Sequence, residues 1–175
     1  MFCLPEVAET MNVNNRAHEM DCADIFVSLI EAFDYKFDRF TRWDWRWTPE
    51  ELIDIPVKNK IYYDRRAVID GRVVFFENDK GTKDKEAVRA QVQRYKDLAS
   101  AIPNEPFTVV FLAQAYRSTS AEERANMLYK LCDEIRLPRG SKFFVGMFDH
   151  FIANPLGDVL AAPGDPTKFV SFLPK

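Results

Sequence analysis

Three carboxylates in the middle of the sequence have a spacing that suits metal chemistry. Asp64 precedes the dipeptide Asp70-Gly71, and Glu77 and Asp79 follow it. Asp-Gly between two runs of β-forming residues predicts a tight hairpin, and the two-residue loop fixes the register of the strands. Counting outward from the loop places Asp64 directly across from Glu77, and the alternation of side chains puts Asp79 on the same face.

Opposed carboxylates of this kind favour a bound cation. Directly opposed residues have Cβ atoms roughly 4.5–5.5 Å apart, so like charges there repel unless a cation or a proton neutralises them. Oxygen ligands suit Mg²⁺ or Mn²⁺, which can lower the pKa of water and stabilise phosphate oxygens during hydrolysis. The alternative is that the carboxylates extend into solvent at the strand ends, with Arg66 as a diagonal counter-ion.

A helix predicted from Gly81-Thr82 to about Ile102 adds polar groups to this face. Its apolar stripe contains Tyr95, and Gln91 lies on the same side one turn earlier. A glutamine within an apolar stripe needs a hydrogen-bonding partner. We therefore expect Gln91 to point at the carboxylates. The alternative is a partly exposed glutamine at the edge of the stripe.

These residues, in this order, resemble the motif series of the PD-(D/E)xK nucleases. The series is Asp64, then Glu77-Asn78-Asp79, then Gln91-Val-Gln-Arg-Tyr95, which is similar to the QxxxY motif of the RecB-type branch. The resemblance implies a restriction-endonuclease-like α/β fold with a mixed central β-sheet flanked by helices.

The resemblance also implies roles for individual residues. Asp64 and Glu77 would bind Mg²⁺ or Mn²⁺, Asn78 would offer its backbone carbonyl, and Glu31 is a candidate for an additional acid on the first helix. Water would attack a phosphodiester while third-motif side chains orient the site. The full set of catalytic candidates is Asp64, Glu77, Asp79, Lys80, Gln91 and Tyr95.

One position departs from the motif series. Asp79 stands where the resemblance expects a lysine, and Lys80, one residue later, should point to the other face of the sheet. Catalysis would then need Lys80 at a twisted strand end, or another group. A non-catalytic protein of this fold is the alternative. On this reasoning, Asp79→Lys should preserve or raise activity.

A narrower resemblance is to plasmid replication-relaxation proteins. It is carried by Ala17-His18, the helix around Asp24, and Phe76-Glu-Asn-Asp-Lys-Gly-Thr82 followed by Tyr95. Those proteins have an acid-x-acid-x-Gly-Thr strand before a helix, usually after a winged-helix DNA-binding part that this sequence does not show. The resemblance implies a role in plasmid or phage DNA metabolism.

The remaining elements follow from hydrophobic periodicity and turn signals. We expect one domain over 1–175, with a loose arm at 1–17 and a surface extension at 154–175. The expected elements are a helix at 19–34, a strand at 40–47, a helical turn opened by Thr48, strands at 60–69 and 72–79, the helix at 82–102, a strand at 107–113, a helix at 121–135 opened by a capping box at Ser120, and a strand at 142–147.

Composition narrows the class of protein. Hydrophobic residues make up 47% of the 175 residues and charged residues 29%, which suits one sizeable core. The net charge of -3 argues against a general nucleic-acid coat, so any DNA contact needs a local basic patch. The candidates for this patch, which are otherwise ordinary solvated charges, are Lys58, Lys60, Arg65, Arg66 and Arg72.

Other kinds of site have less support. Trp43, Trp45 and Trp47 alternate as a core stripe does, and the alternative is a base-stacking platform with Arg42 and Arg46. Neither His18 nor His150 lies in a recognisable nucleophile motif. The three cysteines show no zinc-site spacing and no disulfide framework. With no signal peptide or membrane-spanning run, we expect a cytoplasmic protein.

The sequence therefore predicts a metal-dependent nuclease-fold protein that hydrolyses DNA phosphodiesters, with DNA as its partner. The alternative is a non-catalytic binding or assembly protein of the same fold, such as a replication accessory factor or a phage virion component. That alternative would involve protein partners or a homo-oligomer.

Overall fold

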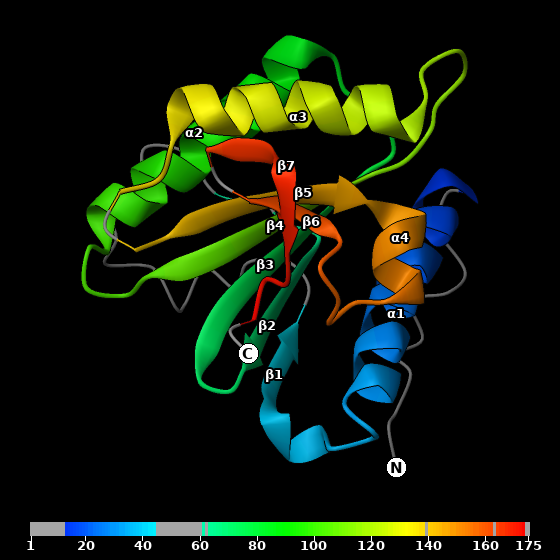
Figure 1. Ribbon diagram of the computed structural model, residues 1–175, viewed down its shortest axis with the longest axis vertical. Helices are drawn as coiled ribbons and strands as arrows, with labels where there is room; N and C mark the ends of the chain where they lie inside the picture. Colours follow the sequence, from blue (N-terminus) through cyan, green and yellow to red (C-terminus); the bar gives the residue numbers. More distant parts are fainter. Residues whose placement is uncertain (1–12, 45–60, 62, 139, 163, 174–175) are drawn as a thin grey trace.

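A computed structural model describes residues 13–44, 61, 63–138, 140–162 and 164–173. In this part of the chain, seven strands form one mixed sheet in which every strand lies beside its neighbour in the sequence (Figure 1). The strands are β1 (Phe40–Asp44), β2 (Arg65–Ile69), β3 (Arg72–Asp79), β4 (Phe107–Ala113), β5 (Lys142–Met147), β6 (Leu160–Ala162) and β7 (Asp165–Val170).

The centre of the sheet is parallel and its two sides are antiparallel. Strands β3, β4 and β5 run parallel, whereas β1–β2–β3 and β5–β6–β7 pair antiparallel. Helices α2 (Lys85–Ala101) and α3 (Ala121–Ile135) cover one face, and α1 (Val13–Ala32) and α4 (Phe148–Ala153) pack against the other (Figure 1). The predicted α/β class with a mixed, helix-flanked sheet is confirmed.

The β2–β3 hairpin has the predicted turn and register. Ile69 pairs with Arg72, and Arg65 pairs with Phe76. Asp70 and Gly71 have φ angles of 49° and 73°, and positive φ at both loop residues is what the favoured two-residue hairpin turn requires. The hairpin therefore fixes which β3 side chains face each layer of helices.

The first hairpin strand is shorter than the predicted 60–69. It begins at Arg65, and residues 61, 63 and 64 lie outside the strand, while Lys60 and Tyr62 are not among the described residues. The backbone N–H of Asn78, which would continue the ladder, donates instead to Oδ2 of Asp64 at 2.8 Å. A side chain thus replaces the backbone at the end of the ladder.

The two sheet faces have separate cores, and alternate β3 residues point into each. Phe75 packs with residues of α2 and α3, whereas Val74 and Phe76 pack with residues of α1 and α4. Continuing this alternation, Glu77 and Asp79 point toward α2 and α3, and Asn78 points toward α1.

Capping decides where the helices on the first face begin. Asp84 accepts a hydrogen bond from the N–H of Ala87 at 2.8 Å, so α2 begins at Lys85 rather than at Gly81-Thr82. Ser120 and Glu123 form the predicted capping box of α3. The loop between β3 and α2 consequently remains outside the helix, and it carries Lys80 and Lys83.

The ends of the described chain differ from the expected loose arm and surface extension. Helix α1 already begins at Val13, within the expected arm of residues 1–17. Strands β6 and β7 lie within residues 154–175, and Leu160, Phe172 and Leu173 are buried in the α1–α4 core. The prolines and glycines of this segment predicted a surface loop. Because the two strands between them are short, hydrophobic periodicity did not reveal them.

Some expectations fall outside what the structure describes. The described part of the predicted strand is β1, which ends at Asp44. The expected continuation to Trp47 and the helical turn at Thr48 lie outside the described residues. The side chain of Trp43 is likewise not described, and the tryptophan stripe stays a prediction. No helix in the described ranges has the length and apolarity that crossing a membrane would require.

Candidate functional site

The carboxylate of Glu77 lies inside the protein between β3 and α2. Its side chain is 2% exposed, and the Tyr95 hydroxyl donates a hydrogen bond to its Oε1. The side chain of Gln91, which is also buried, lies near enough to lower the pKa of Glu77. Because Gln91 and Tyr95 are one helical turn apart, one face of α2 supplies both contacts.

Burial raises the pKa of Glu77 well above its ordinary value, and the negative charge of Asp64 raises it further. The positive charge of Lys83 and the hydrogen bonds from Tyr95 and Gln91 act in the opposite direction but do not outweigh these causes. Glu77 therefore retains a proton at pH values at which an exposed glutamate would be charged.

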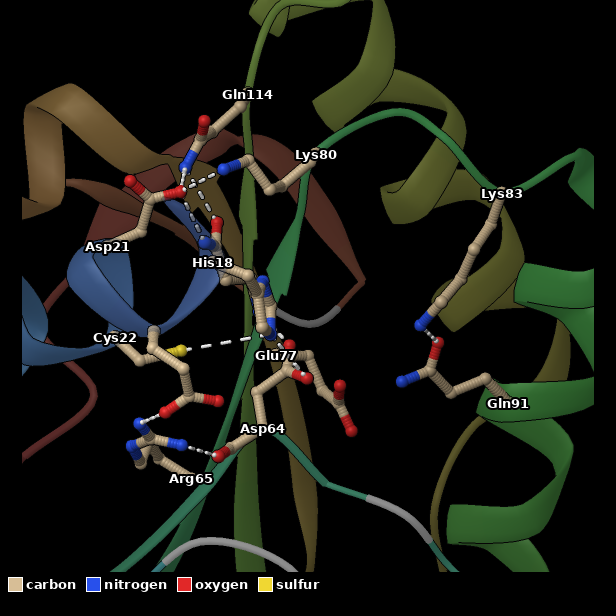
Figure 2. A network of polar contacts seen from close by, with 12 residues as sticks. His18, Asp21, Cys22, Asp64, Arg65, Glu77, Lys80, Lys83, Gln91 and Gln114 are labelled. Atoms are coloured by element: carbon tan, nitrogen blue, oxygen red, sulfur yellow. Dashed lines mark hydrogen bonds and ion pairs between the residues drawn. The ribbon is translucent and has the colours of Figure 1, made fainter. Parts of the chain in front are cut away.

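Asp64 lies at the entrance to β2, beside Glu77 (Figure 2). One of its oxygens accepts the Asn78 N–H described above, and Oδ1 lies 3.0 Å from Nε2 of His18 on α1. The carboxylates of Asp64 and Glu77 are therefore neighbours, as the hairpin register predicted, although Asp64 lies just outside the strand ladder.

A lysine does reach this group, but it is Lys83 rather than Lys80. Nζ of Lys83 donates to Oε1 of Gln91 at 2.9 Å, and Figure 2 shows the two side chains pointing toward each other. Both Lys83 and Gln91 lower the pKa of Glu77, so the pair lies beside this carboxyl group. The lysine lies six residues after the glutamate in sequence, in the loop before α2, so the motif spacing did not single it out.

Lys80 points to the other face of the sheet, as strand alternation predicted. Its Nζ lies 2.8 Å from Oδ2 of Asp21 on α1. The same Asp21 oxygen accepts hydrogen bonds from Asn78 Nδ2 at 3.1 Å and from Gln114 Nε2 at 2.9 Å (Figure 2). Burial raises the pKa of Asp21, but the hydrogen bonds from Lys80, Gln114 and Asn78 lower it by more.

Asp79 is bound by an arginine that sequence reasoning missed. Arg124 on α3 donates through Nε to Oδ2 at 2.9 Å and through Nη2 to Oδ1 at 3.0 Å. Nη2 also donates to the backbone carbonyl of Lys83 at 2.8 Å. Asp79 thus holds Arg124 and the loop that carries Lys83. The structure gives no support to Asp79 as a reacting group.

Helix α1 reaches the site through His18 and Asp21 rather than through Glu31. Glu31 is exposed and lies ten residues beyond Asp21, about 15 Å along the helix. Helical spacing could have identified His18 and Asp21. They lie two turns and one turn before Ile25, so they extend the buried stripe of α1 toward the sheet edge.

A pocket of about 530 Å³ opens beside these groups. Residues of α1, β3, the loop before α2 and the segment after β4 line it. Its lining includes Asp64, Asp79, His18, Lys80, Lys83 and Tyr116, whereas Glu77 does not line it and is closed off from solvent. The lining therefore combines two acidic residues, two lysines and a histidine, and one of the acids, Asp79, is already paired with Arg124.

The expected basic patch does not gather at this pocket. Arg65 pairs with Glu19, and exposed Arg72 follows the hairpin loop at the opposite end of β3 from Asp79. Lys58 and Lys60 lie outside the described residues. Positive charge at the pocket comes instead from Lys80 and Lys83.

A cysteine–histidine mechanism has little support here. Sγ of Cys22 lies 3.9 Å from Nε2 of His18, but burial raises the pKa of this thiol to about 12, so it is not a thiolate at neutral pH. His150, on α4, is exposed. Within the described chain, no set of three or more His, Cys, Asp or Glu side chains is arranged to hold a metal ion.

The comparisons with known proteins give no relative: no family model, no curated protein and no solved structure matches the chain.

Proposed function

We propose that this protein is a metal-dependent nuclease-fold protein that hydrolyses DNA phosphodiesters in plasmid or phage DNA metabolism, in the cytoplasm. The observation that carries the proposal is the adjacency of two carboxylates, Asp64 and Glu77, with the Lys83–Gln91 hydrogen bond beside them. An acid pair with a neighbouring amine suits the handling of a phosphodiester and an attacking water.

Asp64 and Glu77 are the residues that would hold a divalent ion. Asp64 and Glu77 supply hard oxygen atoms, and Mg²⁺ is commonly held by one or two carboxylates while it keeps several waters. Asp64 raises the pKa of Glu77, and a cation would relieve the repulsion between their charges. When bound, Mg²⁺ or Mn²⁺ would supply an activated water and charge for the phosphate oxygens. The Asn78 carbonyl as a further donor stays a prediction.

The chain's own residues then have distinct tasks. The Tyr95 hydrogen bond holds the Glu77 side chain in one orientation, and Gln91 lies beside it. Lys83 places an ammonium group at the pocket, where it can bind a phosphate oxygen or a reacting water. Arg124 fixes the loop that carries this lysine. Lys80 is engaged by Asp21 on the other face, which leaves Lys83 as the better candidate for the missing motif lysine.

One observation favours the second candidate, a non-catalytic binding or assembly protein of the same fold. Glu77 is 2% exposed and does not line the pocket, so a ligand in the pocket meets only Asp64 of the proposed pair. A carboxyl group that stays protonated and hydrogen-bonded to Tyr95 would stabilise the fold without binding metal. The protein would then act through protein partners or a homo-oligomer.

Calorimetric titration with Mn²⁺ and Mg²⁺ separates the two candidates. The titration uses wild type, Asp64→Asn and Glu77→Gln, with Asp149→Asn as a matched control because Asp149 is an exposed carboxylate on α4. We expect binding in wild type and the control, and its loss in both site variants. Nicking of plasmid DNA should follow the same pattern.

Two results would count against the nuclease. One is a folded wild type that binds neither ion. The other is metal binding that persists unchanged in both site variants. Either would leave the binding or assembly protein as the better description.

A further inference from the structure

The segment after β4 forms a short turn at the rim of the pocket. Tyr116 and Thr119 exchange two backbone hydrogen bonds, of 2.9 and 3.0 Å, across Arg117 and Ser118. Arg117 has a φ angle of 53°, a left-handed conformation that only a few per cent of non-glycine residues adopt. This positive φ lets the two-residue turn close, as it does at Asp70 in the β2–β3 hairpin.

The turn is fixed to the loop that carries the site lysines. A Cβ atom added to Gly81 would lie 2.7 Å from the Tyr116 Cβ, so the two residues are in close contact. Gly81 follows Lys80 directly, and its N–H donates to Oδ1 of Asp79 at 2.9 Å. Tyr116 is therefore held in a defined place relative to the carboxylates rather than on an independent loop.

Tyr116 is an aromatic side chain that the core does not use. It is 37% exposed and lines the pocket together with Asp64 and Lys83. The guanidinium carbon of Arg117, which is also exposed, lies 5.0 Å from the centre of the Tyr116 ring. Aromatic rings and arginine side chains are the groups on which unpaired bases stack.

We propose that Tyr116 and Arg117 form a base-stacking subsite for single-stranded DNA at the rim of the pocket. This inference rests on the proposed function, because the pocket would hold the neighbouring phosphate. A base beside that phosphate can stack on the Tyr116 ring, while the exposed Arg117 guanidinium binds the next phosphate. In duplex DNA each base is covered by its neighbours, so the subsite selects a strand whose bases are unstacked.

The test is the binding of fluorescein-labelled oligonucleotides, measured by fluorescence anisotropy with Ca²⁺ in place of Mg²⁺ to prevent hydrolysis. A 12-nucleotide single strand is compared with a duplex of the same sequence. The variants are Tyr116→Ala, Tyr116→Phe and Arg117→Gln. Phe169→Ala is the matched control, since Phe169 is an exposed aromatic residue on β7 that does not line this pocket.

We expect Tyr116→Ala to weaken single-strand binding by at least about 5-fold, the loss of one base stack, with a much smaller effect on the duplex. Tyr116→Phe and Phe169→Ala should bind as wild type, and Arg117→Gln should lose affinity and salt sensitivity together. Equal losses for single strand and duplex, or a loss in Phe169→Ala as large as in Tyr116→Ala, would overturn the proposal. Tighter binding of single-stranded RNA with the same Tyr116 dependence would overturn its restriction to DNA.

The two proposals fail separately. If Mg²⁺-dependent cleavage depends on Asp64 and Glu77 but no binding step depends on Tyr116, the stacking subsite is wrong and the nuclease stands. If single-strand binding depends on Tyr116 and no metal or variant yields cleavage, the subsite stands and the nuclease is wrong. Thermal melting of Tyr116→Ala should match wild type, because the ring is partly exposed.

Discussion

The phenol of Tyr95 donates a hydrogen bond to Glu77 where neither side chain meets solvent; Tyr95 is 0% exposed and Glu77 2%. Burial, and then the negative charge of Glu77, raises the pKa of Tyr95, so the phenol remains a proton donor across the accessible pH range. The ring is held by edge and tilted contacts with Phe75, Phe107, Phe111 and Phe143. This aromatic cluster makes the orientation of the Glu77 carboxyl a property of the core.

The raised pKa of Glu77 predicts a specific pH dependence of stability. The folded state holds the Glu77 proton more tightly than the unfolded state, so this group contributes stability below the ordinary glutamate pKa and loses it as pH rises toward the folded pKa. Glu77→Gln cannot ionise. The variant should therefore gain stability relative to wild type as pH increases, in urea melts from pH 4 to pH 8. A constant difference across this range would contradict the assignment.

The motif series suggested that Asp79→Lys would preserve or raise activity, whereas the Arg124–Asp79 pair predicts the opposite. Both side chains are nearly buried, at 10% and 7% exposed, and the substitution would place a second cation against Arg124. We expect Asp79→Lys to unfold more easily and to lose activity. Arg124→Met should destabilise by about 3–5 kcal/mol, since it leaves a buried carboxylate without its partner.

A double-mutant cycle checks this pair. Asp79→Asn, Arg124→Met and the combined variant are compared by denaturant unfolding, and strong coupling is expected between the two positions. Arg136→Met is the control, because Arg136 pairs with Asp133 on the exposed side of α3 and should contribute little. Additive effects of Asp79→Asn and Arg124→Met would mean that the pair does not hold the loop.

The two loop lysines should differ in their effect on cleavage. Lys83 binds Gln91 beside Glu77, whereas Lys80 binds Asp21 on the other face. Lys83→Met should lower the rate of Mg²⁺-dependent cleavage on the order of 100-fold, as expected for loss of a charge-stabilising or proton-transferring group. Lys80→Met should mainly lower the melting temperature. If Lys80→Met lowers the single-turnover cleavage rate more than Lys83→Met does, Lys80 rather than Lys83 is the lysine that assists cleavage.

The balance of charge predicts how the protein binds DNA. The chain has a net charge of -3, and the pocket lining contains Asp64 and Asp79 as well as its two lysines. Binding should be weak without a divalent cation and should fall steeply as salt increases, because the remaining contacts are with phosphate. Anisotropy titrations across a salt series, with and without Ca²⁺, measure both effects. Affinity that does not respond to salt would favour a protein partner.

Local signals predicted much of the fold and half of the site. The Asp70-Gly71 loop set the β2–β3 register, and the Ser120 capping box set the start of α3, because both depend on a few adjacent residues. The placement of Gln91 beside Glu77 followed from helical spacing over a sheet. These features need only local geometry and one packing assumption.

The missing parts depend on contacts between distant segments. Arg124 reaches Asp79 across 45 residues of sequence, and Asp21 meets Gln114 across 93 residues. No spacing rule links such positions, since they meet only once α1 and α3 have packed on opposite faces of the sheet. Lys83 was missed for a different reason: it lies in a loop, where neither strand nor helix periodicity gives a direction.

The sheet order has a consequence for synthesis on the ribosome. Each strand is hydrogen-bonded to the strand made just before it, so the growing chain can extend the sheet in order of translation. Helix α1 precedes the strands in the sequence, yet its apolar residues Ile25, Leu29 and Phe33 pack against side chains that include Val110 and Phe144. Nascent chains that end before β4 would therefore expose the α1 stripe, and they should be the lengths that bind chaperones most strongly.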